Sequence, residues 1–157
     1  MEYFIRELKS SEYPLLKEFL YHAIFQRDPN NLIPRSVLDD PSISIYIQDF
    51  GRYKEDYCLC AESESQVVGA VWVRNIEGFG SIDDHTPEFA ISLQPEYHGF
   101  GIGTALMRAM LAKLKELGYA QTSLAVQKDN YAVKMYSQVG FEIIDENQEE
   151  YIMICKL

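Results

Sequence analysis

Three glycines at alternate positions, directly before a long amphipathic segment, constrain the fold of this chain more than any other feature. The segment from Pro95 to Tyr119 reads PEYHGFGIGTALMRAMLAKLKELGY, with glycines at 99, 101 and 103. From Ile102 onward, apolar residues recur with the 3.6-residue period of a helix, and Gly118 supplies a stop at the C-terminal end. The pattern predicts a glycine turn that leads straight into a helix over 102–117.

The glycines favour a phosphate site at the start of this helix. Glycine tolerates positive φ and lacks a Cβ, so another molecule can approach its backbone closely. The first N–H groups of a helix have no partner within the helix, and the helix dipole makes that end partly positive. One glycine would suffice for a tight turn without a ligand, whereas three at alternate positions favour a bound anion.

The other segments predict a mixed α/β chain that forms one domain over 1–157. Strands are expected at 2–8, 56–63, 66–76, 88–94, 121–127, 142–145 and 151–157, and helices at 10–25, 34–51, 102–117 and 130–139. This order predicts an antiparallel meander first, and then one parallel β-α-β crossover around the glycine turn. The ligand site is expected at the carboxyl ends of the strands that flank the crossover.

Composition excludes several classes of function. A net charge of −10 argues against nucleic acid as a partner and is compatible with a cationic acceptor such as an amine. No apolar run is long enough to cross a membrane, and the early charges of MEYFIRELKS do not fit a signal peptide. Cys58, Cys60 and Cys155 lack metal-site spacing, so we expect no metal and reduced thiols in a cytoplasmic protein. Cys58 and Cys60 are expected on one face of a strand.

Two other phosphate-binding patterns fit less well. A dinucleotide site needs G-x-G-x-x-G near the first strand, whereas here the glycines run G-x-G-x-G after a long meander. A P-loop needs a lysine before its Ser or Thr, and here Gly103 precedes Thr104.

Two motifs together resemble the GNAT superfamily of acyl-CoA-dependent N-acetyltransferases. They are ISLQPEYHGFGIGTALM and, further along, NYAVKMYSQVGFEI. The resemblance implies a central twisted mixed β-sheet with helices on both faces, and the expected order of elements fits it over the whole chain. One departure is His98, which stands where the family usually has Arg or Gln.

The resemblance implies acetyl-CoA as the co-substrate. The backbone amides of the glycine turn would hold its pyrophosphate, and they belong to Gly99, Phe100, Gly101, Ile102, Gly103 and Thr104. The pantetheine arm would pair with the backbone of Ile91 and Leu93 like an added strand. Asn130 would contact the arm, although some members place this Asn where the chain has Asp129. Lys134 or Arg108 is a weaker candidate for the outlying phosphate, and His98 is expected on the surface near the pyrophosphate.

The implied reaction moves an acetyl group to a primary amine by direct attack. An amine attacks only in its neutral form, so a base helps at neutral pH. Glu88 is the candidate base, with His85 or water as alternatives. Tyr136 matches the family's tyrosine on the last helix and would act as general acid toward the departing thiolate, although its place in an apolar stripe also fits core packing.

The sequence does not identify the acceptor, which we expect to be a small-molecule or peptide amine. The acceptor pocket is expected between the first two helices and the loop GSIDDHTPEF, where Asp83, Asp84, Trp72 and Tyr46 are candidate wall residues. The sequence is compatible with a homodimer but does not determine the oligomeric state. The alternatives are a non-catalytic CoA-binding sensor or scaffold module, and an interaction protein that shares only the fold.

Overall fold

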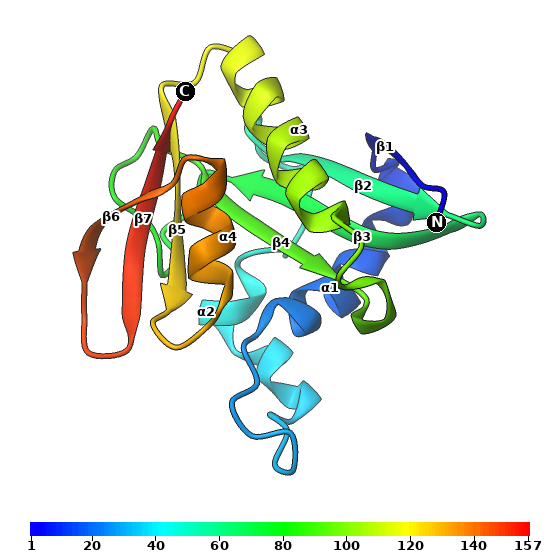
Figure 1. Ribbon diagram of the computed structural model, residues 1–157. Coiled ribbons are helices and arrows are strands. Elements are labelled where there is room, and N and C mark those ends of the chain that lie inside the picture. Colours follow the sequence, from blue (N-terminus) through cyan, green and yellow to red (C-terminus); the bar gives the residue numbers. More distant parts are fainter.

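The computed structural model describes residues 1–157 and contains one seven-stranded sheet in the order β1-β2-β3-β4-β5-β7-β6. Its strands are β1 Phe4–Glu7, β2 Tyr57–Ser63, β3 Gln66–Arg74, β4 Glu88–Leu93, β5 Gln121–Gln127, β6 Glu142–Glu146 and β7 Glu150–Lys156. Every neighbouring pair is antiparallel except β4 and β5, which are parallel (Figure 1). The predicted meander and the single parallel crossover are therefore confirmed.

Helices cover both faces of the sheet, as the mixed α/β prediction requires. The long helix α3 (Ile102–Glu116) and α4 (Ala132–Val139) lie on one face (Figure 1). The other face carries α1 (Leu16–Ala23) and α2 (Pro41–Ser44), with the short 3-10 helices η1 (Ser10–Leu15) and η2 (Arg35–Asp39). A third 3-10 helix, η3 (Pro95–Tyr97), precedes the glycine turn.

Alternation along the central strands sends side chains into two separate cores. Leu59, Val71 and Phe89 belong to the core under α3, whereas Cys60 and Trp72 belong to the core under α1. Cys58 joins Cys60 in the second core, so the prediction that they share a face is confirmed. Each strand therefore offers one face to each helical layer.

The two N-terminal helical segments are less regular than expected. Residues 10–25 form η1 and then α1, because Pro14 has no N–H to donate to an α-helical ladder. Lys9 is the N-cap of η1, and its N–H donates to Glu12 Oε1 at 2.9 Å. The segment 34–51 is helical only in η2 and α2, which are separated at Asp40.

A buried ion pair ties the segment after α2 to the sheet. Arg74 on β3 donates through Nε to Asp56 Oδ1 and through Nη2 to Asp56 Oδ2, both at 3.0 Å. Its Nη1 also donates to the carbonyls of Ile45 and Gln48. The side chains of Arg74 and Asp56 are only 2% and 0% exposed, so each buried charge needs the other to compensate for its lost hydration.

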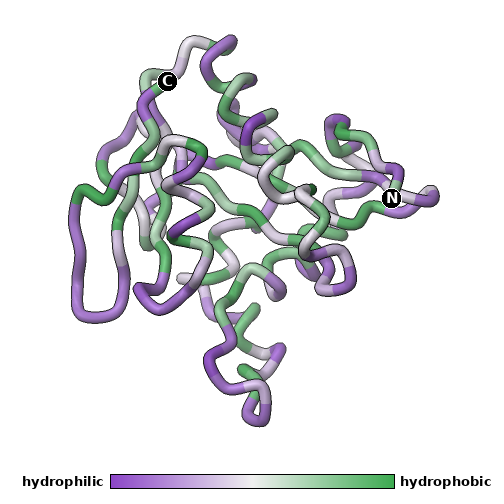
Figure 2. The backbone as a smooth tube through the Cα atoms, in the orientation of Figure 1, coloured by the Kyte–Doolittle hydropathy of each residue, from purple (hydrophilic) through white to green (hydrophobic).

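Apolar residues follow the strands and the inner faces of the helices, whereas the turn between β6 and β7 is strongly hydrophilic (Figure 2). None of the helices combines the length and the apolar character that crossing a membrane requires.

Candidate acyl-CoA site

The glycine turn has an open backbone surface in front of α3. Gly99 and Gly101 have φ of 86° and 80°, in the left-handed region that side chains rarely adopt. A Cβ added at either would meet no atom within 4 Å. Gly103 differs, because it has no positive φ and a Cβ there would make ordinary contacts with Leu93 and Met135. The conformation therefore requires the first two glycines, and the third leaves extra room.

Six consecutive N–H groups at this turn have no acceptor in the protein. They belong to residues 99–104, and the next one, Ala105, donates to the carbonyl of Gly101 at 3.1 Å. No acidic residue stands in the first turn of α3. Unpaired N–H groups at the positive end of a 15-residue helix form a site for an anion.

Strands β4 and β5 separate just beside this turn. They share a single paired position, Glu88 with Ser123, although both strands continue well beyond it. On the other side of β4, Gln94 N donates to Val68 O, so the even-numbered residues direct their backbone groups toward β3. The backbone groups of Ile91 and Leu93 consequently face the gap between the strands.

Two cavities meet in this gap. The larger, of about 620 Å³, lies between the glycine turn, the end of β4, the start of α4 and the segment after α1. The smaller, of about 200 Å³, is lined by residues of α1, α2, β4, β5 and the loop before β4. The two share Ala23, Ile24, Phe25, Ile91, Asn130 and Tyr136 in their walls. A molecule in one cavity therefore meets a molecule in the other at these side chains.

Tyr136 projects from α4 to this junction. Its ring packs edge-on against Phe141, with 5.6 Å between ring centroids. Burial raises the pKa of Tyr136 to about 12, so the hydroxyl keeps its proton at neutral pH. The side chain thus combines core packing, which its apolar stripe suggested, with a protonated hydroxyl in the wall of both cavities.

Glu88 lies on the side of the smaller cavity and is only 2% exposed. Its Oε2 accepts from the Tyr46 hydroxyl at 2.7 Å and from Gly80 N at 3.2 Å, and its Oε1 accepts from Gly78 N at 2.8 Å. Burial raises the pKa of Glu88, and the three donors oppose that change. The carboxylate also fixes the loop before β4.

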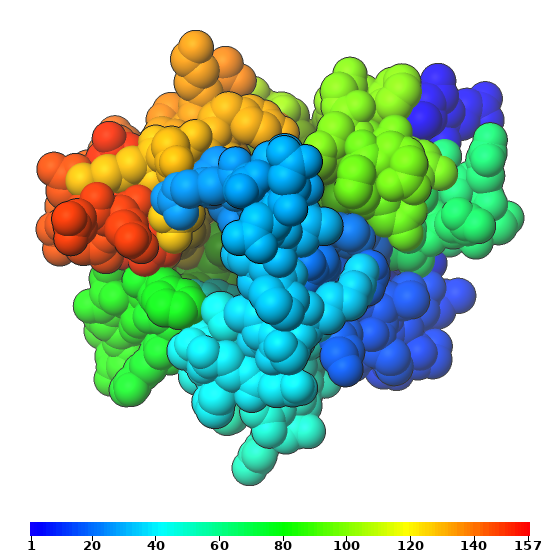
Figure 3. Space-filling model, turned by 90° about the horizontal axis from the view of Figure 1, so that it is seen from below, coloured from blue at the N-terminus to red at the C-terminus, as the bar shows by residue number.

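The structure separates the two candidates at the start of α4. Asn130 lines both cavities, and its Oδ1 accepts from Ala132 N at 2.9 Å. Asp129 is exposed and paired with Arg27, whose Nε and Nη2 lie 2.7 and 2.9 Å from its two carboxylate oxygens. Arg27 Nη2 also lies 2.6 Å from Gln127 Oε1, so the segment after α1 is tied to the opposite wall (Figure 3).

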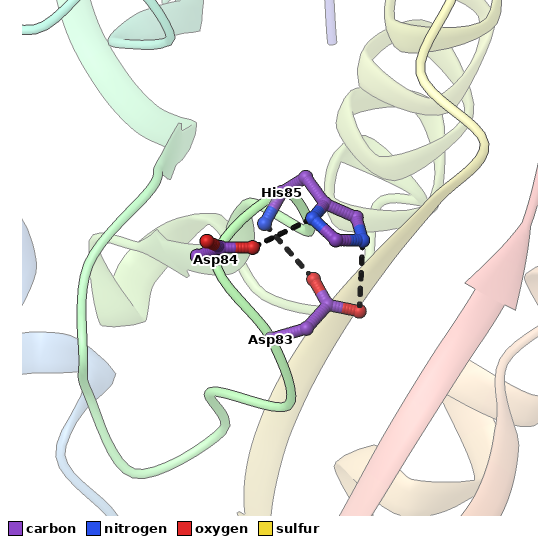
Figure 4. Close-up of side chains that lie close together, drawn as sticks. All are labelled: Asp83, Asp84 and His85. Carbon is purple, nitrogen blue, oxygen red and sulfur yellow. Dashed lines mark hydrogen bonds and ion pairs between the residues drawn. The ribbon is translucent and has the colours of Figure 1, made fainter.

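His85 lies outside both cavities. Its side chain is 82% exposed, and its Nδ1 is 2.7 Å from Asp84 Oδ1 in a loop that also holds Asp83 (Figure 4). None of these three residues lines either cavity, so the structure brings neither the alternative base nor the two aspartates to the junction.

The remaining predicted residues divide between the cleft and other environments. His98 is exposed and lines the larger cavity, as do Leu93, Ile102 and Thr104. The Phe100 side chain is 54% exposed and lines neither cavity, so only its N–H belongs to the site. Tyr46 lines the smaller cavity, whereas Trp72 is buried and donates to Tyr46 O. Lys134 and Arg108 are exposed and line neither.

Sequence reasoning missed several wall residues, namely Phe25, Gln127 and Glu150. Gln127 and Glu150 face each other across β5 and β7 at the open end of the gap. The pairing of the last strand with β5 would have been the signal, because it places the first residue of β7 beside the last residue of β5.

The fold and the site define an α/β protein in which a helix start with unpaired N–H groups lies beside a splayed pair of parallel strands. Residues 11–141 match the description "Acetyltransferase (GNAT) family". The chain belongs to the GNAT acetyltransferase family.

Curated relatives match over part of their length only. A [Ribosomal protein bS18]-alanine N-acetyltransferase of Haemophilus influenzae is 32% identical over 68 residues, which cover 43% of this chain and 47% of that protein. A mycothiol acetyltransferase of Actinosynnema mirum is 29% identical over 89 residues, which cover 55% of this chain and 28% of that protein. The chain thus spans less than half of the length of either relative.

Solved structures share the fold over the whole chain. PaiA N-acetyltransferase from Thermoplasma acidophilum, in complex with coenzyme A, superposes with a TM-score of 0.74 at 20% identity, covering 100% of both chains. A putative acetyltransferase of Acinetobacter baylyi superposes with a TM-score of 0.75 at 16% identity, covering 99% of this chain and 93% of that one. The predicted sheet and its helices on both faces therefore match known GNAT structures.

Proposed function

We propose that the chain is an N-acetyltransferase that transfers the acetyl group of acetyl-CoA to a primary amine by direct attack. The observation that carries the proposal is the run of six unpaired N–H groups from 99 to 104 beside the gap between β4 and β5. The larger cavity extends from these N–H groups to Tyr136. A diphosphate bound at the glycine turn would therefore leave room for a thioester beside Tyr136.

The residues present fit the co-substrate. The N–H groups of Gly99 through Thr104 would donate to the pyrophosphate, and the larger cavity of about 620 Å³ is of a size that holds a drug-sized ligand. The free backbone groups of Ile91 and Leu93 would pair with the amides of the pantetheine arm, as in strand addition. Asn130 is the contact on the opposite wall, because Asp129 is held by Arg27.

Acetyl-CoA supplies an acyl group on a thioester, so transfer to a neutral amine forms an amide and releases CoA as a thiol. Tyr136 would give its proton to the departing sulfur, because its high pKa keeps the hydroxyl protonated at neutral pH, and the proton that Glu88 takes from the amine would return to Tyr136 through solvent before the next turnover. Glu88 would take the proton that the amine loses, directly or through water. Burial raises the pKa of Glu88 toward the range in which a base works best at neutral pH.

A thiol-release assay with acetyl-CoA and a panel of primary amines tests this proposal, with CoA binding measured separately by thermal shift. We expect amine-dependent release of thiol and stabilisation by CoA. CoA binding without turnover of any amine would instead support the sensor or scaffold module. An absence of CoA binding would contradict the use of this site by an acyl-CoA.

The role of Glu88 has a pH test that structural damage would not mimic. Tyr46→Phe removes one donor to the carboxylate, so the pKa of Glu88 should rise further and the acid limb of kcat/KM should move to higher pH. Glu88→Gln should abolish that limb. An acid limb that stays unchanged in both variants would exclude Glu88 as the base.

A further inference from the structure

We infer that the acceptor is a small primary amine with an apolar body and no anionic group, held in the smaller cavity. This inference rests on the proposed function and names the class of substrate. It is carried by the lining of the cavity, its volume and the wall that it shares with the larger cavity.

The smaller cavity lies where an acceptor must sit. It shares Ile91, Asn130 and Tyr136 with the larger cavity, on the side of the sheet that α1 and α2 cover. An amine placed there approaches the junction from the side opposite the glycine turn. It would therefore reach a thioester at Tyr136 without passing the pyrophosphate end of the larger cavity.

The lining favours an apolar molecule. Of the 17 residues around the smaller cavity, 13 are hydrophobic, and they include Leu20, Ile24, Phe25 and Ile43. Such walls favour the burial of apolar surface. Polar side chains among them are partly used already, since the Tyr46 hydroxyl bonds Glu88 and Gln127 Oε1 bonds Arg27, so fewer groups remain for a hydroxyl or amide of the acceptor. A sugar or a polar peptide backbone would lose its hydrogen bonds with water and regain few of them.

The charges in the cavity exclude an anionic acceptor. No Lys, Arg or His lines it, whereas Glu88 and Glu150 both do. A carboxylate or phosphate on the acceptor would be desolvated beside two glutamates, and the Arg27 guanidinium that bonds Gln127 is already paired with Asp129. An α-amino acid is therefore disfavoured against the amine that lacks its carboxyl group.

Glu150 is the more open of the two carboxylates. Three donors already bind Glu88, but no Lys, Arg or His pairs with Glu150. Glu150 is half-buried at the first position of β7, opposite Gln127. An incoming ammonium group supplies the positive charge that this carboxylate lacks, so Glu150 would attract the acceptor before it is deprotonated.

The volume limits the part of the acceptor that lies inside the cavity. An apolar cavity of roughly 150 Å³ holds benzene in a well-known engineered case. The cavity here, of about 200 Å³, thus has room for a ring plus a short chain. Benzylamine and 2-phenylethylamine match this size, whereas spermidine brings two further charged nitrogens into apolar walls.

The test compares acceptors that differ in one property each. Initial rates of thiol release would be measured with 2-phenylethylamine, L-phenylalanine, benzylamine, spermidine and a short peptide with a free N-terminus. We expect kcat/KM for 2-phenylethylamine to exceed that for L-phenylalanine by roughly 100-fold, because only the amino acid brings an unpaired anion into the cavity. Spermidine and the peptide should also be poorer acceptors than 2-phenylethylamine, because each brings additional polar or charged groups into largely apolar walls.

Two variants and their matched controls check that the acceptors use this cavity. Ile43→Phe should fill the smaller cavity and raise KM for 2-phenylethylamine without changing KM for acetyl-CoA. The same change at the exposed Ile144 should leave both KM values unchanged. Glu150→Gln should lower kcat/KM for the amine about tenfold through lost charge attraction, and the neighbouring Glu149→Gln should not. CoA-induced thermal stabilisation shows that each variant is folded.

The failure of this inference differs from the failure of the proposed function. A preference for spermidine, the peptide or L-phenylalanine would overturn the inference while the acetyltransferase function stands. Equal effects of Ile43→Phe and Ile144→Phe on 2-phenylethylamine would overturn it as well. Thiol release that depends on none of the amines would overturn the proposed function and, with it, this assignment.

Discussion

Replacement of Gly101 by alanine separates anion binding from backbone strain. Gly101 has φ of 80°, and an alanine there would occupy the left-handed region at a cost of about 1–2 kcal/mol. For a domain of this size, such a change lowers Tm by roughly 2–4 °C per kcal/mol. The added methyl group would meet no protein atom within 4 Å, so no clash adds to this cost.

Gly101 lines the larger cavity, so the same methyl group would take up space that we assign to the pyrophosphate. Displacing a phosphate from one of these donors forfeits a hydrogen bond to a charged group, worth about 1.5–3 kcal/mol. Since 1.4 kcal/mol corresponds to a factor of ten, the Kd for CoA should rise at least about tenfold. Isothermal titration with CoA measures this change directly.

Gly118 provides the matched control. Its φ is 91°, a Cβ there would also meet no atom within 4 Å, and it lies beyond the C-terminal end of α3 and outside both cavities. Gly118→Ala should lower Tm by a similar amount and leave the affinity for CoA unchanged. Equal affinity of the two variants for CoA would refute the assignment of the glycine turn to the pyrophosphate.

Three further substitutions probe the site and the scaffold. Tyr136→Phe should lower kcat while the Kd for CoA changes little, since the ring still packs on Phe141; equal losses in both would indicate a packing role. Asp56→Asn leaves the buried Arg74 charge without its partner and should lower the free energy of unfolding by about 3–5 kcal/mol, measured by urea denaturation. Arg6 holds the pKa of Glu12 down at about 2, so the carboxylate stabilises the fold above its unfolded pKa, and this contribution is lost as pH falls toward 2. The stability difference between the wild type and Glu12→Gln should therefore be full near neutral pH and shrink between about pH 4.5 and 2, and a difference that is independent of pH would contradict this linkage.

The sequence predicted the features whose cause is local. Gly99 and Gly101 stand where positive φ is needed, and the apolar period of α3 marks its inward face, so turn and helix follow from neighbouring residues alone. The register at the start of α4 is different. Asn130 and Asp129 differ by one residue, and the structure separates them through Arg27, which lies about a hundred positions earlier in the chain.

Burial of Glu88 also lay beyond the sequence. By strand alternation Glu88 shares a face of β4 with Ala90 and Ser92, and both of these small residues pack on the side of α1. However, the donors to Glu88 come from Tyr46 and from the loop at 78–80, which approach only once α2 has packed on the sheet. From the sequence alone, a carboxylate at the start of a strand is expected to be exposed to solvent, because the distant partners that bury it cannot be seen.

The alternation of β4 explains how one strand can serve two substrates. Its odd-numbered residues, such as Ile91, turn their backbone groups toward the gap, where a pantetheine arm would pair. Its even-numbered residues, Glu88 and Ala90, direct their side chains to the face that α1 covers, where the smaller cavity lies. A slip of one residue in the pairing with β3 would exchange both sets at once. The register of β3 and β4 would therefore fix the proposed cofactor pairing and the proposed acceptor lining together, so a shift of this strand would disturb both.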